Sequence, residues 1–133
     1  MKLCMRIGVA EIAKLLGVEP GAIRIWRNRG ICRFGLDGAS YAADYSRDDV
    51  LVMAWALALK KAGFELKEAF EIAEAHRATA VRYIANDLPQ ERYLIAYPGS
   101  TNAGAELDLA AHPISVVINM EWIARDLFGV GDR

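Results

Sequence analysis

The feature that most constrains this chain is a short helix whose two ends are marked in the sequence, between Pro20 and Gly30. Proline suits the first position of a helix because it lacks the N–H group that would have no partner there, and glycine suits the residue just past the end. Between these ends, Ile23 and Trp26 lie three residues apart and therefore share one side of the helix. The sequence predicts a short helix with one buried side.

A second stripe of the same helix is cationic. Arg24 and Arg27 are also three residues apart, and Arg29 and Arg33 extend this side. The planar guanidinium group of arginine can hold a phosphate, or the edge of a guanine, through two hydrogen bonds. Ordinary solvated charge is the alternative, but such charge would be scattered and not gathered on one stripe.

Another short amphipathic helix is predicted just upstream, over residues 11–16, and Gly17 ends it. Two short helices joined by a tight turn form a helix-turn-helix motif, in which the first helix braces the second and the second enters the major groove of DNA. The pattern therefore favours a DNA-binding head.

These residues resemble the winged helix-turn-helix of MerR-type DNA-binding domains. The resemblance rests on an ordered series of blocks, none of which is specific by itself. The blocks are residues 7–13 (IGVAEIA), 17–18 (GV), 23–26 (IRIW), 29–30 (RG), 45–50 (YSRDDV) and 61–68 (KAGFELKE). The resemblance covers roughly the first half of the chain, and it implies a wing, two further helices and binding to double-stranded DNA.

The predicted wing is a β-hairpin over residues 31–45, with its tight turn at Asp37-Gly38. MerR-type wings usually carry arginines just before the tyrosine that leads into the third helix, whereas this chain has residues 42–44 (AAD) there. This departure leaves open whether Arg33, Ser40 and Tyr41 replace the family's wing contacts.

The resemblance implies a set of DNA-contacting residues in the head. Their roles are to read the major groove from the second helix and to hold the phosphate backbone around it. The set is Lys14, Arg24, Ile25, Arg27, Asn28, Arg29, Arg33, Ser40 and Tyr41.

The distribution of charge supports a polyanionic partner although the net charge of the chain is only −1. Residues 1–35 contain seven Lys or Arg against two Asp or Glu, a net charge of +5. The remaining residues contain nine Lys or Arg against fifteen Asp or Glu, a net charge of −6. A basic head on an acidic body would orient docking on DNA, because the body is repelled by the phosphates.

Two more helices are predicted after the wing. Ser46 and Asp49 form a capping box that starts a helix ending near Gly63, and this helix is apolar on nearly every side, so it must be buried on more than one side. A longer helix then runs over residues 65–85. Its glutamate series and His76 are interpreted as a solvated face and a surface or capping histidine, and not as a metal site.

The chain departs from the family after residue 87, where no long helix for a coiled coil follows. Strands are predicted over residues 92–97 and 114–118, with a loop of small residues over 100–112, and then a helix capped by Asn119 and closed by Gly129. Two strands are not stable alone, so they must pack on the helices or pair across a dimer. The loop either closes over a small ligand beside Tyr93 or Tyr97, or is a surface loop beside a dimerisation segment.

The sequence thus predicts a mainly helical α+β chain. Residues 1–87 form the winged helix-turn-helix head with its third and fourth helices, and residues 88–133 form a short strand-containing dimerisation or ligand segment. The predicted function is sequence-specific binding of double-stranded DNA by a dimeric transcriptional regulator, with a small-molecule or protein effector at the C-terminal segment. The alternatives are an excisionase-like recombination accessory factor, and a protein-binding adaptor or antitoxin-like module that has lost DNA binding.

Other classes have little support in the sequence. Cys4 and Cys32 lack the spacing of a metal site or a disulfide framework, and two partly buried thiols are expected. Neither a phosphate-binding glycine loop nor a nucleophile motif is present, so no cofactor and no enzymatic activity are predicted. No run reaches the ~18 apolar residues of a membrane span, and no apolar signal region precedes Ile7, so a cytoplasmic protein is expected.

Overall fold

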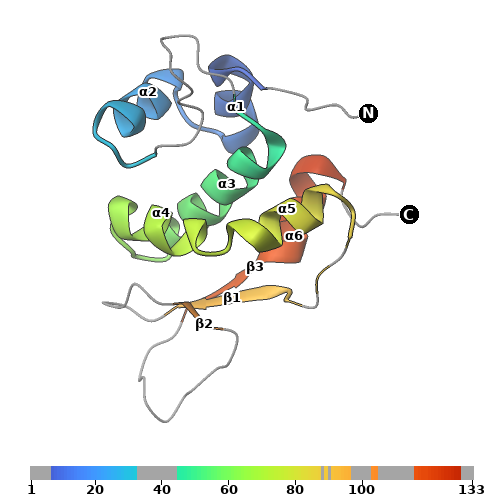
Figure 1. The fold of residues 1–133 in the computed structure, drawn as a ribbon. Helices are drawn as coiled ribbons and strands as arrows, with labels where there is room; N and C mark the ends of the chain where they lie inside the picture. Colours follow the sequence, from blue (N-terminus) through green and yellow to red (C-terminus); the bar gives the residue numbers. More distant parts are fainter. Residues whose placement is uncertain are drawn as a thin grey trace. The chain divides into compact units, whose positions relative to one another are not determined.

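The computed structural model describes residues 7–32, 45–87, 89, 91–96, 103–104 and 116–129. The chain divides into two compact units, residues 1–50 and 51–133, which are described separately here. Helices predominate and the strands form one small sheet, so the predicted α+β class is confirmed (Figure 1). The domain boundary predicted at residue 87 stays a prediction.

The first unit is built on two short helices, α1 (Val9–Leu16) and α2 (Pro20–Asn28), which pack against each other. Gly17 ends α1 with a φ of 71°, a left-handed conformation that glycine adopts at low cost, and Pro20 opens α2 as predicted. Ile12 of α1 and Ile23 of α2 are both fully buried. The predicted helix-turn-helix is therefore present, with its two apolar stripes in the core of the unit.

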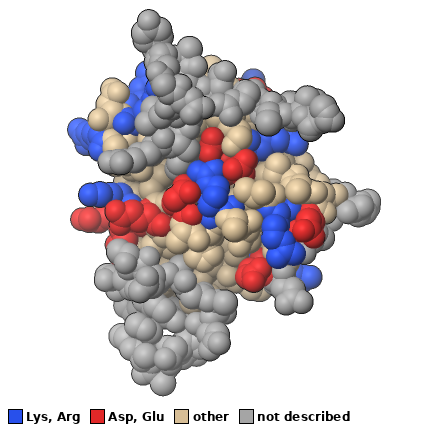
Figure 2. Space-filling model, in the orientation of Figure 1, with Lys and Arg blue, Asp and Glu red and all other residues tan. Residues whose placement is uncertain are grey.

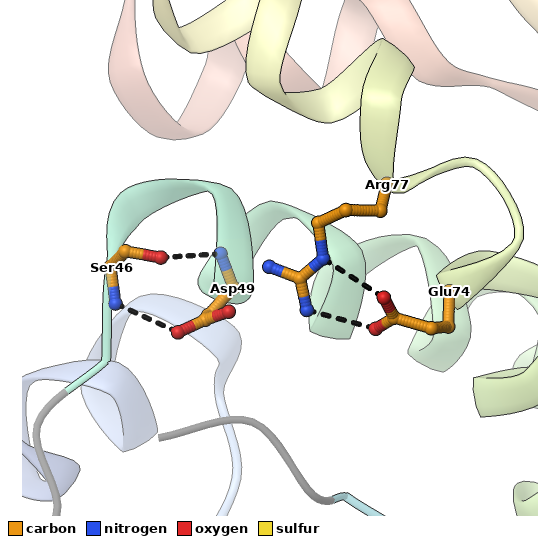
Figure 3. A network of polar contacts seen from close by, with 4 residues as sticks. All are labelled: Ser46, Asp49, Glu74 and Arg77. Atoms are coloured by element: carbon orange, nitrogen blue, oxygen red, sulfur yellow. Dashed lines mark hydrogen bonds and ion pairs between the residues drawn. The ribbon is translucent and has the colours of Figure 1, made fainter. Parts of the chain in front are cut away.

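Helix α3 (Arg47–Lys61) begins with the predicted capping box. The Ser46 N–H donates to Oδ2 of Asp49 at 3.0 Å, and the Asp49 N–H donates to Oγ of Ser46 at 3.2 Å (Figure 3). Each side chain thus satisfies an N–H group that the helix itself leaves without a partner. The four consecutive residues 50–53 are all fully buried, and because they point in different directions around the axis, burial on more than one side is confirmed.

The prediction of a single long helix over residues 65–85 is wrong. The structure has two helices, α4 (Leu66–Glu74) and α5 (Arg77–Ile84), separated at Ala75 and His76. The backbone N–H of His76 donates to the Ala73 carbonyl at 2.9 Å, three residues back, and His76 has φ −107° and ψ 24°. The break contains neither glycine nor proline, so no local sequence signal marked it.

Side chains stabilise the break between α4 and α5. The Glu74 carboxylate accepts from Nη2 of Arg77 at 2.8 Å and from Nε at 3.0 Å, which joins the two helices by a two-point ion pair (Figure 3). Nδ1 of His76 lies 3.1 Å from the Ile72 carbonyl oxygen. Because a carbonyl only accepts, this nitrogen carries the proton, and His76 caps the end of α4 as a structural histidine.

The second unit contains a three-stranded antiparallel sheet in the order β2-β1-β3. Strands β1 (Tyr93–Ala96) and β3 (Val116–Asn119) confirm the two predicted strands over the described residues, and they pair from Tyr93 opposite Asn119 to Ala96 opposite Val116. The short strand β2 (Ala103–Gly104) corrects the prediction that this segment is all loop. Two small residues have no side-chain alternation that could have predicted a strand.

The last helix, α6 (Met120–Phe128), has both predicted caps. Oδ1 of Asn119 accepts from the Trp122 N–H at 2.9 Å, and Gly129 closes the helix with a φ of 66°. Helix α6 contacts α5 and β1 within this unit (Figure 1). The predicted strands therefore pack on a helix, although the large apolar residue Trp122 is exposed and the buried positions of α6 are Met120 and Ala124.

The core of the second unit includes an aromatic pair. The rings of Trp55 and Tyr83 meet edge to face, with centroids 6.2 Å apart. The Tyr83 hydroxyl donates to the Glu91 carbonyl at 2.8 Å. Burial, with a smaller contribution from the negative charge of Glu121, raises the pKa of Tyr83 to about 12. Tyr83 is therefore a neutral structural donor that ties α5 to the segment leading into β1.

Candidate nucleic-acid interface

Helix α2 presents one apolar face to the core of the head. Ile23 is fully buried and Trp26 is 7% exposed, so the predicted packing role of both is confirmed. With this face held against α1 and the core, the remaining side chains of α2 are directed away from it.

The outward side chains of α2 are mainly polar or cationic. Arg24, Ile25, Asn28 and Arg29 are exposed, and Lys14 is exposed on α1. Figure 2 shows basic side chains over the region of α2 on the face drawn. Lys or Arg donors and an amide on one short helix can bind phosphate oxygens and base edges, which is the chemistry required of a helix in the major groove.

Arg27 is half-buried, whereas Arg24, Asn28 and Arg29 are exposed, and its charge affects a buried group of the head. Its positive charge lowers the pKa of Tyr45, although burial and then the nearby Cys32 have the larger effect, so the pKa of Tyr45 is raised overall. Cys32 is a fully buried thiol. Helical spacing placed Arg24 and Arg27 on the same stripe, but it did not separate an exposed arginine from one that is also part of the head's packing.

Tyr45 anchors the segment that leads into α3. Its backbone pairs with Ile7 in an antiparallel bridge, with N–H to carbonyl distances of 2.7 and 2.9 Å in the two directions. Its side chain is fully buried, and within the described part of the chain no group forms a hydrogen bond with its hydroxyl. This bridge fastens the start of the head to the segment just before the capping box.

The remaining predicted contacts cannot be placed. Arg33, Ser40 and Tyr41, together with the other residues of the wing segment 33–44, lie outside the described residues, as do Cys4 and Tyr97. The contacts assigned to the wing stay predictions.

The described part of the chain holds no group of three or more His, Cys, Asp or Glu side chains suited to a metal ion. Within the same residues, the helices are all too short or too polar to cross a membrane.

Comparison with known families identifies the head. The family model described as the MerR HTH family regulatory protein matches residues 7–76, which is more than half of the 133 residues. A comparison with curated proteins found no match. The matched segment runs from the Ile7–Tyr45 bridge through α1, α2 and α3 to the end of α4. The chain therefore belongs to the MerR family of helix-turn-helix regulatory proteins, and in general terms it is a DNA-binding transcription regulator.

Proposed function

We propose that this protein is a dimeric, cytoplasmic transcriptional regulator that recognises a specific sequence in double-stranded DNA through α2. The observation that carries the proposal is the division of α2 into two faces. Ile23 and Trp26 hold the helix in the core, while Arg24, Asn28 and Arg29 remain exposed. Family membership accounts for DNA binding in general, and this division supports α2 as the surface that performs it.

The exposed residues have distinct proposed roles. Arg24 and Asn28 are four residues apart and so share a face, from which they reach base edges in the major groove. Arg29 at the end of α2 and Lys14 on α1 bind flanking phosphates. The buried part of the Arg27 side chain supports α2 within the head. Its exposed part reaches the major groove or the flanking phosphates.

Selection of bound duplexes from random DNA tests this function. We expect one recurring sequence, arranged as two half-sites related by a two-fold axis and about one helical turn apart, because each subunit presents one recognition helix. Failure to enrich any sequence would contradict the proposal. Tandem sites that are filled cooperatively and bent, as seen by footprinting, would favour the excisionase-like alternative instead.

The proposed dimer requires an apolar surface on the second unit. Three of the exposed large apolar side chains described in this unit lie on β1, β3 and α6: Tyr93 is 52%, Val117 51% and Trp122 60% exposed, while a fourth, Val81, lies on α5. Tyr93 pairs opposite Asn119 and Val117 opposite Ile95, so Tyr93 and Val117 lie on the same face of the sheet. Tyr93, Val117 and Trp122 form the proposed functional surface of the C-terminal segment. A second subunit covers this surface in the proposed dimer, and an effector is the alternative occupant.

Replacing Trp122 with serine is expected to weaken the dimer at least tenfold, because an exposed tryptophan is the type of side chain that dominates interfaces. The dissociation constant is measured by light scattering over a range of protein concentrations. Ile25→Ser is a matched control, since Ile25 is 49% exposed in the first unit and this variant should dimerise normally. A wild-type protein that stays monomeric at every concentration would rule out the dimer.

A further inference from the structure

One side chain on the exposed part of α2 does not fit an electrostatic role. Ile25 is 49% exposed, and among the described residues up to Val50 it is the one large apolar side chain with this much contact with solvent. The other large apolar residues of α2, Ile23 and Trp26, are buried. Single exposed apolar residues are common on proteins, so exposure by itself assigns no role.

The position of Ile25 is more informative than its exposure. Asn28, the last residue of α2, and Arg29, its C-cap residue, lie three and four residues further along the chain and share the face of Ile25, and both are exposed. Arg24 precedes it directly and is exposed as well. An apolar side chain thus sits among the three polar side chains that would meet DNA.

DNA offers one apolar group to such a side chain. In the major groove the 5-methyl group of thymine is an apolar group that distinguishes an A·T pair. The other groups that the bases present there are hydrogen-bond donors and acceptors. A branched aliphatic side chain gains free energy by covering this methyl group and has no hydrogen-bonding group to leave unsatisfied.

We propose that Ile25 determines sequence specificity by packing on the 5-methyl group of a thymine. The inference rests on the proposed function, because it assumes that α2 enters the major groove. It adds a distinct claim, which is that one A·T pair in the recognised sequence is read by an apolar contact flanked by the hydrogen bonds of Arg24 and Asn28.

The test replaces each thymine of the selected duplex, one at a time, with uracil, which lacks only the 5-methyl group. For wild-type protein we expect one such replacement to lower the affinity about fourfold, the factor that corresponds to one buried methyl group. For Ile25→Ala the same replacement should change the affinity by much less, because the shorter side chain does not reach the methyl group. Affinities are measured by fluorescence anisotropy.

Val81→Ala is the matched control. Val81 is 47% exposed on α5, in the second unit, so its truncation should leave the fourfold effect of uracil in place. Circular dichroism confirms that both variants are folded. Ile25→Val, which keeps a branched side chain, should restore most of the sensitivity to uracil.

The possible outcomes distinguish a failure of this inference from a failure of the proposed function on which it rests. Specific binding that no uracil replacement weakens, or a selected site without a required thymine, would overturn the role of Ile25 and leave DNA binding intact. Equal sensitivity to uracil in wild type and Ile25→Ala would overturn it in the same way. Absence of specific DNA binding by the wild type would refute the proposed function and, with it, the role of Ile25.

Discussion

DNA binding by this protein is expected to weaken by about a thousandfold or more between low and moderate salt. Each phosphate neutralised by a lysine or arginine releases condensed counterions, and raising the salt concentration opposes that release. The residues proposed to contact phosphates come from a segment with a net charge of +5, residues 1–35. The measurement is a series of anisotropy titrations of the selected duplex at increasing salt, plotted as the logarithm of affinity against the logarithm of salt concentration.

The same titrations decide between DNA binding and the adaptor alternative. An adaptor that binds another protein through the apolar surface of the second unit has few phosphate contacts to lose, so any association with DNA would be weak and would depend little on salt. A nearly flat plot for the selected duplex would contradict the DNA-binding head, whatever the family match suggests.

Replacing Arg24 with alanine is expected to weaken DNA binding by about 1–3 kcal/mol, or about 5–150-fold, if its guanidinium group makes a two-point contact with a base. Arg24 is exposed on α2, so its loss should leave the packing of Ile23 and Trp26 unchanged. Mobility shifts measure the affinity, while circular dichroism and light scattering check the fold and the oligomeric state.

The Arg27→Ala variant is expected to lose affinity in the same range and also to lose stability. Arg27 is half-buried, and its positive charge opposes the rise in the pKa of Tyr45 that burial causes, so its side chain belongs partly to the head. Thermal unfolding of the two variants should therefore differ, with Arg24→Ala close to wild type. Unchanged DNA affinity in both variants would discredit the assignment of α2 as the recognition helix.

Features fixed by neighbouring residues could be predicted from the sequence. Pro20 at the start of α2, the reciprocal bonds of Ser46 and Asp49, and the Asn119 cap of α6 each depend on a side chain and a backbone group within a few residues. The apolar stripe with Ile23 and Trp26 was predictable for the same reason, because helical period alone places both on one side.

Features that depend on distant contacts were not predictable in this way. The break at Ala75 and His76 is a separate case, because the Glu74–Arg77 ion pair and the His76 contact with Ile72 that stabilise it are local, but their spacings of three and four residues also occur within a continuous helix. Strand β2 exists through its pairing with β1 and not through its own residues. The partial burial of Arg27 likewise depends on the three-dimensional packing of the head, which spacing along α2 does not report.

The most direct test of the central claim compares Arg24→Ala with Arg82→Ala on the selected duplex at one fixed salt concentration. Both variants remove one positive charge from an exposed helical position, Arg24 from α2 and Arg82 from α5 in the other unit. If α2 is the DNA-binding surface, Arg24→Ala lowers the affinity by about 5–150-fold while Arg82→Ala changes it by no more than about twofold. Equal losses in the two variants, or a loss only for Arg82→Ala, would contradict the account.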